Sequence, residues 1–284
     1  MTDRHRPKKR FGQHFLRDAR VIERIVAAFA PQPTDHVVEI GPGEGVLTQA
    51  LAGRVAHLDL VELDRDLAAQ LAHTYAGAPA IAVHQADALK FDFRALAPHR
   101  DVPVSRETGG RERPVPGQAL RLIGNLPYNI STPLLFHALE QVECVRDMLF
   151  MLQKEVVDRL AAPPGGKDYG RLSVMVQYRC RVEKLFTVPP GAFNPPPKVD
   201  SAVVRLTPHA TPPVGVRDPA VFARVVQAAF SQRRKTLRNS LKGLVSAEAM
   251  TALGIDPVRR AETLGLQEFA ALANSAAPAF FTPL

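Results

Sequence analysis

The chain has 284 residues, a mass of 31.0 kDa and a formal net charge of +8, with 46% hydrophobic and 23% charged residues. This hydrophobic fraction builds a core and excludes global disorder, and no apolar run approaches the ~18 residues that a membrane span needs. No apolar segment with a cleavage site follows the basic N-terminus, so we expect a cytoplasmic protein whose two cysteines, Cys144 and Cys180, are reduced.

The excess positive charge lies in two segments, residues 1–17 and 230–242. The first carries six lysines and arginines against one acid, and the second carries five against none, so each has a net charge of +5. Phe11, Phe15 and Phe230 lie within these segments. Concentrated basic residues with neighbouring aromatic rings are typical of a nucleic-acid contact surface, and a solvated tail or helix face is the competing interpretation. The candidate nucleic-acid-binding residues are Arg233, Arg234, Lys235 and Arg238, the second and last of which are expected to share a helix face.

In chain order, the hydrophobic pattern alternates between helices and short strands. Asp18 is placed to cap a first helix whose apolar face ends at Phe29, before Pro31 and Pro33. We expect strands over 36–40, 58–63, 80–85, 120–124 and 148–152, and helices over 46–52, 66–75 and 133–140. Short strands joined by crossover helices predict an α/β fold with a mostly parallel sheet.

Two stretches interrupt this alternation. Residues 101–118 are polar, nonperiodic and rich in proline and glycine, which predicts a mobile surface insertion. Residues 207–219 have the composition of a linker, and beyond them the pattern predicts only short helices. These helices are expected over 221–230, 235–244 and 266–273. We therefore expect one domain over 1–206, including a basic N-terminal arm over 1–17, and a helical, nucleic-acid-binding domain over 220–284.

A glycine-rich turn, EIGPGEG at 39–45, separates the first predicted strand from the next helix. Such a turn lets a ligand approach the backbone beside a helix N-terminus. A dinucleotide fingerprint needs glycine where Val46 stands, which makes an NAD dehydrogenase the least expected function. The spacing GxGxG after an acidic residue instead resembles the first motif of class I S-adenosylmethionine-dependent methyltransferases. Glu62, ending the next strand, is placed to accept ribose hydroxyl hydrogen bonds, and Asp87, after the third strand, to contact an adenine amino group.

The tetrapeptide Asn125-Leu126-Pro127-Tyr128 follows the fourth strand and therefore lies at the same sheet edge as the glycine turn. The N6 of adenine is a poor nucleophile because its lone pair is delocalised into the ring. The side-chain oxygen of Asn125 and a backbone carbonyl near Leu126 can hold the N6 hydrogens and localise that lone pair towards a methyl donor. Pro127 stiffens the turn, and Tyr128 offers a ring for stacking a flipped base. A simple Asn-x-Pro turn is the alternative interpretation.

Longer motifs extend this interpretation over nearly the whole chain. They are KKRFGQHFL (8–16), GNLPYNISTPLLFHAL (124–139), MLQKEVVDRL (151–160), YGRLSVMVQY (169–178), PPGAFNPPPKVDSAVVRL (189–206) and FSQRRKTLRNSL (230–241). With them, the sequence resembles the bacterial 16S ribosomal RNA adenine N6,N6-dimethyltransferases, the kasugamycin-sensitivity enzymes, which are class I S-adenosylmethionine-dependent methyltransferases. The resemblance implies a Rossmann-like fold: a mostly parallel seven-stranded sheet, helices on both faces and a small C-terminal helical domain.

The same resemblance implies an activity. Enzymes of this family dimethylate two adjacent adenosines in a hairpin near the 3′ end of 16S rRNA, within the 30S subunit, and act in late small-subunit biogenesis. We expect the same of this chain, with S-adenosylmethionine as cofactor, no metal, no membrane contact and a monomeric state.

Site residues follow from matching the family's motifs position by position. The implied cofactor contacts are His14, Leu16, Gly41, Glu62, Asp87 and Asn125, and the implied catalytic segment is Asn125–Tyr128. His14 is a departure, because the family more often has Asn there, and an imidazole cannot make every hydrogen bond that a carboxamide makes. Phe193 is expected to supply the second aromatic face of the base pocket beside Tyr128, with loop packing as its alternative role.

Other functions stay open at this stage. One is the methylation of a single 23S rRNA adenosine, against which the long PPPKVDSAVVRL and RRKTLRNSL segments argue. A DNA adenine methyltransferase usually has a diproline in the catalytic tetrapeptide, where this chain has Leu126. A ribosome-assembly checkpoint factor, whose binding matters more than its catalysis, is a further alternative from a different functional class.

Overall fold

The computed structural model describes residues 13–97, 119–232 and 234–276. The predicted insertion, residue Arg233 and most of the basic N-terminal arm lie outside these described residues. The described chain divides into two compact units. The first takes in the described parts of Met1–Val157 with Arg181–Pro208, and the second those of Asp158–Cys180 with His209–Leu284.

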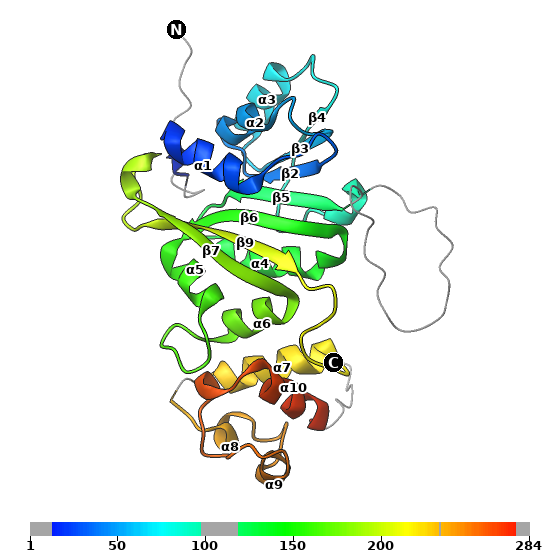
Figure 1. The fold of residues 1–284 in the computed structure, drawn as a ribbon, viewed down its shortest axis with the longest axis vertical. Coiled ribbons are helices and arrows are strands. Elements are labelled where there is room, and N and C mark those ends of the chain that lie inside the picture. The colour runs from blue at the N-terminus through cyan, green and yellow to red at the C-terminus, as the bar shows by residue number, and fades with distance from the viewer. Residues whose placement is uncertain (1–12, 98–118, 233, 277–284) are drawn as a thin grey trace, which may run out of the picture. The chain divides into compact units, whose positions relative to one another are not determined.

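The first unit is built on a seven-stranded sheet with the order β4-β3-β2-β5-β6-β9-β7 (Figure 1). Its strands are β2 (His36–Ile40), β3 (His57–Glu62), β4 (Ile81–Gln85), β5 (Leu120–Asn125), β6 (Val145–Gln153), β7 (Cys180–Val188) and β9 (Ser201–Pro208). The pairs β3–β4, β2–β3, β2–β5 and β5–β6 are parallel, and β9 is antiparallel to β6. The predicted mostly parallel α/β sheet is therefore confirmed.

Five helices of the chain lie between or beside these strands. They are α1 (Ala19–Phe29), α2 (Val46–Leu51), α3 (Arg65–Thr74), α4 (Ser131–Glu140) and α5 (Lys154–Ala161). Asp18 caps α1 as predicted, since its carboxylate accepts hydrogen bonds from the N–H groups of Arg20 and Val21. The consecutive residues Val37 and Val38 point to opposite faces of the sheet and are both fully buried, so helices cover both faces.

A small second sheet ties the N-terminal segment to a distant loop. Strand β1 (Phe15–Leu16) pairs antiparallel with β8 (Phe193–Asn194), and the Arg17 N–H donates to the Ala192 carbonyl at 2.8 Å. Both strands have two residues, too short to carry a periodic pattern. This pairing fixes residues 13–16 next to the carboxyl edge of the large sheet.

The second unit is helical. Its helices are α6 (Arg171–Arg179), α7 (Pro219–Phe230), α8 (Leu237–Ser240), α9 (Ala247–Ala252) and α10 (Leu266–Ser275). The described residues also form short 3-10 turns, at Phe93–Leu96, Val142–Cys144 and Pro190–Ala192 in the first unit and at Ala261–Thr263 in the second. Phe222 and Phe269 are fully buried at the centre of this unit.

The division differs from the predicted boundaries in one segment. Residues 158–180 were expected in the first domain, but Val174 and Tyr178 of α6 belong to the apolar cluster of the second unit. The ring of Tyr178 lies 4.6 Å from that of Phe222, centroid to centroid. Residues 158–180 supply apolar side chains to the core of the second unit, and for this reason they belong to that unit.

The predicted helix over 235–244 is wrong: only Leu237–Ser240 are helical. The N–H of Leu237 donates to the Arg259 carbonyl at 2.8 Å, and that of Arg238 to the Pro257 carbonyl at 2.9 Å. These N–H groups are used outside the helix, so it begins at 237 and leaves Arg234 in a preceding turn. Among the described residues, no helix has the length and apolar character required to cross a bilayer.

Candidate active site

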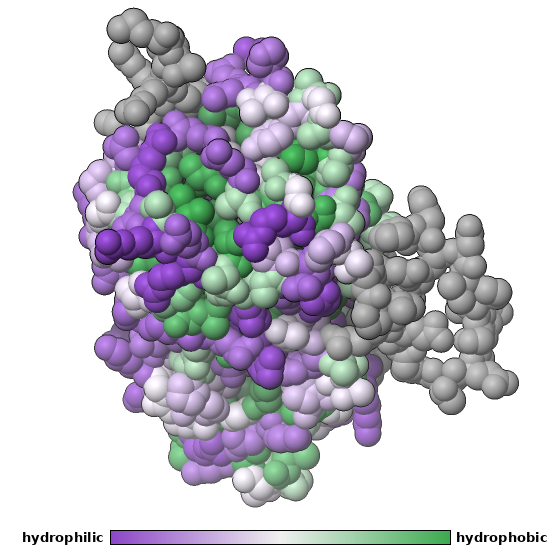
Figure 2. Space-filling view, turned by 45° about the horizontal axis from the view of Figure 1, so that its top comes forward, coloured by the Kyte–Doolittle hydropathy of each residue, from purple (hydrophilic) through white to green (hydrophobic). Residues whose placement is uncertain are grey.

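A cavity of about 380 Å³ opens at the carboxyl edge of the large sheet. Its lining comes from residues 13–16, 39–44, 46–47, 61–63, 86–89 and 125–130. On the face drawn in Figure 2, hydrophobic residues are exposed in a recess among hydrophilic ones. A volume of this size, with few polar groups in an apolar lining, is typical of a cofactor site.

The glycine turn after β2 forms the floor beside helix α2. Gly43 has φ +58°, and a Cβ built there lies 3.0 Å from the Phe15 ring. A side chain at 43 would therefore be strained by the backbone and obstructed by Phe15. Gly41 and Gly43 both line the cavity.

Glu62 ends β3 with a fixed carboxylate. Its two oxygens accept hydrogen bonds from the Gly43 N–H (3.1 Å) and the Asp64 N–H (2.8 Å). Burial raises the pKa of Glu62, while these two backbone hydrogen bonds lower it. Because each carboxylate oxygen has two lone pairs, the group can still accept hydroxyl hydrogen bonds from a ligand in the cavity.

Asp87 lies on the segment that follows β4. Its carboxylate accepts the Leu89 N–H at 3.0 Å, and residues 86–89 together line the cavity. The local hydrogen bond holds this acid at the cavity wall. The sequence analysis predicts that Asp87 contacts an adenine amino group.

Glu39, at the end of β2, is a buried acid that the sequence analysis assigned no role. Its Oε2 accepts the Thr48 hydroxyl at 2.6 Å. Burial raises the pKa of Glu39 to about 7. The hydrogen bond from Thr48 lowers this pKa, and the charge of Glu62 raises it further. Near neutral pH the carboxyl of Glu39 is therefore partly protonated.

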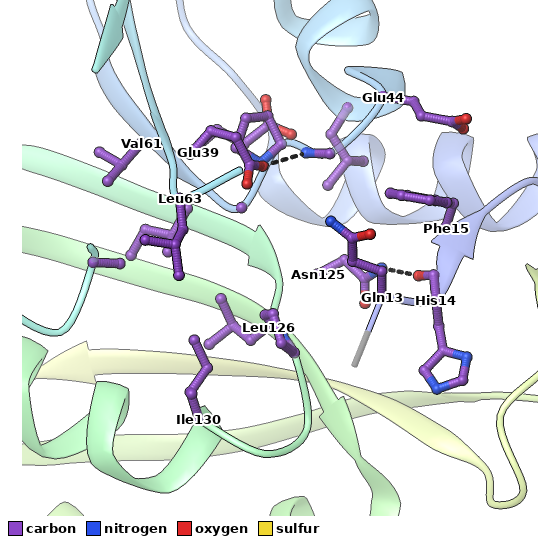
Figure 3. A pocket seen from close by; sticks show the side chains of 18 of the residues that line it. Gln13, His14, Phe15, Glu39, Glu44, Val61, Leu63, Asn125, Leu126 and Ile130 are labelled. Carbon is purple, nitrogen blue, oxygen red and sulfur yellow. Dashed lines mark hydrogen bonds between the residues drawn. The ribbon is translucent and has the colours of Figure 1, made fainter. Parts of the chain in front are cut away.

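Asn125 is held in one orientation by the N-terminal segment (Figure 3). Its Nδ2 donates to the backbone carbonyl of His14 at 2.9 Å. A carbonyl can only accept a hydrogen bond, so the amide nitrogen of Asn125 must face it. The other end of the amide, the acceptor Oδ1, therefore points the opposite way. Gly124 precedes it because a Cβ there would lie 2.5 Å from the Ile40 carbonyl oxygen.

Tyr128 is fixed at its hydroxyl and along one ring face. The hydroxyl lies 2.6 Å from the Ser201 Oγ, and the His14 imidazole is stacked on the ring at 5.5 Å between centroids. The His14 Nδ1 lies 2.8 Å from the Pro195 carbonyl oxygen. In Figure 3 the imidazole points away from the Asn125 side chain. The His14 side chain is thus engaged with Tyr128 and Pro195, and its carbonyl is what reaches Asn125.

The cavity brings together most of the predicted site residues. His14, Leu16, Gly41, Glu62, Asp87 and the segment Asn125–Tyr128 all line it. Phe193 does not: it is 4% exposed, pairs with Leu16 across β1 and β8, and packs in the apolar cluster of the first unit. Strand pairing has drawn this ring into the core, which is the loop-packing role given as its alternative.

The predicted RNA-binding residues lie in the second unit. Arg234, Lys235 and Arg238 are exposed. Because the helix begins at Leu237, Arg234 and Arg238 do not share a helix face, contrary to the expectation from their spacing.

Three contributors to the site were not singled out in the sequence. Ser201 and Pro195 lie within the quoted PPPKVDS segment, which was the only signal for them. Gln13 belongs to the KKRFGQHFL motif and lines the cavity. Their positions depend on the β1–β8 pairing and on the path of the loop before β9, which local patterns do not specify.

The chain is similar to known ribosomal RNA methyltransferases over nearly its whole length. Ribosomal RNA small subunit methyltransferase A of Pseudomonas putida is 54% identical over 273 residues, covering 96% of each chain. The protein of the same name from Nitrosococcus oceani is 56% identical over 268 residues, covering 94% of this chain and 95% of its own.

Two solved structures have the same fold over 91% of this chain. A dimethyladenosine transferase from Plasmodium falciparum has a TM-score of 0.71 at 24% identity, with 96% of its chain covered. The 23S rRNA methyltransferase ErmE has a TM-score of 0.64 at 26% identity, with 98% covered. The sequence profile of a family described as ribosomal RNA adenine dimethylase matches residues 4–278. The chain therefore belongs to the ribosomal RNA adenine dimethylase family.

Proposed function

We propose that this protein transfers methyl groups from S-adenosylmethionine to the N6 atoms of two adjacent adenosines in 16S rRNA, dimethylating each. One observation supports this proposal most directly: the glycine turn, the Glu62 carboxylate and the oriented amide of Asn125 all line the same cavity. The more than 50% identity to proteins named small subunit methyltransferases favours 16S over 23S rRNA as the substrate.

The residues present fit S-adenosylmethionine. Glu62 presents a carboxylate for the ribose hydroxyls, and Asp87 presents an acceptor for the adenine amino group. The glycine turn brings its backbone to the cavity wall without side chains at 41 and 43. When bound, S-adenosylmethionine supplies an electrophilic methyl group on a positively charged sulfur. The methyl donor and the target base would then meet between the glycine turn and Asn125.

Asn125 and its neighbours act on the target base. The Oδ1 of Asn125 accepts one N6 hydrogen, and a backbone carbonyl near Leu126 accepts the other, which directs the nitrogen lone pair towards the methyl group. Tyr128, held by Ser201, stacks on the base from the ring face opposite His14. Alignment of the two reacting atoms would supply most of the rate enhancement. As N6 bonds to the methyl carbon, the carbon–sulfur bond of the donor would break to leave a neutral thioether, and the N6 proton, acidified by the new bond, would pass to water.

The exposed arginines and lysine of the second unit would bind the rRNA backbone without reading its sequence. We further propose that the substrate is the 30S subunit and that the enzyme is a cytoplasmic monomer. The basic character of residues 230–242 supports the backbone contact.

The test is to incubate the protein with labelled S-adenosylmethionine and unmethylated 30S subunits and then map the methylated nucleotides. Two adjacent dimethylated adenosines near the 3′ end of 16S rRNA are expected. Label in 23S rRNA or in DNA would overturn the substrate assignment. Tight binding of 30S subunits with no label transferred would favour the checkpoint alternative.

A further inference from the structure

Three histidines surround one buried carboxylate on the sheet of the first unit, away from the residues that line the cavity. The carboxylate belongs to Asp59 of β3, whose side chain is 2% exposed. The imidazoles belong to His36, which begins β2, His57, which begins β3, and His84 of β4. None of these four residues lines the cavity or has a role in the proposed methyl transfer.

The sheet register explains why they meet. His36 pairs with His57, Val38 with Asp59, and Val61 with His84. Because side chains alternate between faces along a strand, His36, His57, Asp59 and His84 all project from the same face. The grouping is set by the strand pairing itself rather than by loop conformation.

The distances between their polar atoms are short. The Oδ2 of Asp59 lies 2.6 Å from the His36 Nε2 and 3.5 Å from the His57 Nε2. The ligand atoms of these three residues all lie within 4.8 Å of one another. On the other side, the Oδ1 of Asp59 lies 2.5 Å from the His84 Nε2.

We propose that His36, His57 and the Oδ2 of Asp59 bind a divalent transition-metal ion, for which Zn²⁺ is the probe. Two imidazole nitrogens and a carboxylate oxygen form a common three-ligand set, with water as the fourth ligand. Neighbouring ligands of a tetrahedral Zn²⁺ are about 3.4 Å apart, so the observed separations of 2.6 to 4.8 Å need changes of at most about 1.4 Å.

Both oxygens of Asp59 are held by imidazoles, Oδ2 by His36 and Oδ1 by His84. His84 orients the Asp59 side chain from behind through Oδ1, as an outer-shell partner does.

Access is provided by the imidazoles. The side chains of His36 and His57 are 17% and 37% exposed, so a hydrated ion can reach them and they have room to rotate. The competing interpretation is a hydrogen-bonded cluster in which imidazoles merely satisfy a buried carboxylate. That cluster needs no metal and gives no defined stoichiometry, so titration separates the two.

The experiment titrates the chelator-treated full-length protein with Zn²⁺ by calorimetry. We expect one ion per chain and a rise in melting temperature on binding. His84→Gln should weaken binding about 10- to 100-fold, the usual effect of removing an outer-shell partner. His57→Gln and His36→Gln, which remove ligands, should weaken it at least as much.

The matched control is His73→Gln, at an exposed histidine of α3 outside the cluster, which should bind Zn²⁺ like the parent chain. Replacing Zn²⁺ by Co²⁺ adds a readout of geometry: the parent chain should give the intense visible bands of a tetrahedral ion, and His57→Gln should not. Absence of stoichiometric binding, or equal affinity in the parent and in both ligand variants, would overturn the proposal. Circular dichroism of each variant shows whether a loss reflects the site or the fold.

Discussion

Asn125 is oriented by a backbone group of another segment, so its amide is already aligned before a base arrives. We expect Asn125→Ala to bind 30S subunits normally but to transfer methyl groups at least about 100-fold more slowly, the scale of losing one positioned polar group. Single-turnover rates on saturated complexes measure this. Asn129→Ala, at an exposed amide of the same turn, should cost far less. If binding and chemistry fell together, Asn125 would be structural.

For Glu62 we propose a different contribution: its carboxylate, which lines the cavity, would contact the cofactor rather than the base. Glu62→Ala removes a charged acceptor, a loss of about 1.5–3 kcal/mol, and should weaken S-adenosylmethionine binding about 10- to 100-fold. Glu62→Gln, which keeps one acceptor oxygen, should fall between this variant and the parent. Calorimetry with the cofactor decides, and an unchanged affinity in the alanine variant would remove Glu62 from the site.

Glu39 links the cavity to pH. Its pKa is raised by burial from 4.5 to about 7. The folded chain therefore keeps a proton that the unfolded chain loses, and this contribution to stability is present below pH 4.5 and lost as pH rises through 7. Glu39→Gln should abolish that loss.

The free energy of unfolding in urea, without cofactor, tests this at pH 5, 6.5 and 8. The difference between Glu39→Gln and the parent should shift in favour of the variant with rising pH, by about 3 kcal/mol at most. A difference that stays constant across this range would show that Glu39 titrates near its ordinary pKa.

At the scale of elements, the buried strands were the most predictable. The expected strand over 36–40 coincides with β2, and those for β3 and β4 agree to within one residue at each end. The central parallel strands, which are covered on both faces, carry short apolar stretches such as Val37–Val38 in β2. The glycine turn and Asn125 could therefore be placed at one sheet edge from the sequence alone.

The remaining elements depend on partners far away in the sequence. Strand β7 has a mostly half-exposed burial pattern, so no apolar run marks it. Phe193 is buried by pairing with Leu16, and the His14 ring is directed by Pro195. None of these contacts is encoded locally, which is why the motif could identify these residues but not their roles.

The turn that precedes α8 changes how the basic segment is tested. Because Arg234 and Arg238 lie on different structural elements, each would contact its own phosphate. The double variant Arg234→Ala, Arg238→Ala should bind 30S subunits more weakly, with the log–log salt slope flattened by somewhat under one unit per lost contact. Its affinity for S-adenosylmethionine should be unchanged.

The matched control removes two exposed arginines of the first unit, Arg54 and Arg65. This control should keep the parent's salt slope. A steep, parent-like slope in the Arg234, Arg238 variant would instead assign those residues to a solvated surface.

At the scale of the whole molecule, two separate apolar cores stabilise the chain. Phe222 is fully buried in the second, so Phe222→Ala should cost about 3–5 kcal/mol. Hydrogen exchange should accelerate in 158–180 and 219–275 and stay slow in β2 and β3. Equal acceleration in both units would show that the two cores unfold as one.

The pairing of β1 with β8 also sets an order of events during synthesis. Residues 13–16 leave the ribosome early, but their partners at 193–194 emerge only after about two thirds of the chain has been translated. Until then the segment 13–16, which carries the His14 carbonyl, has no strand to pair with, and Asn125 has no fixed orientation. A nascent chain that stops before residue 193 is consequently released with an open, unfinished cavity, so the enzyme acquires its active site late in its own translation.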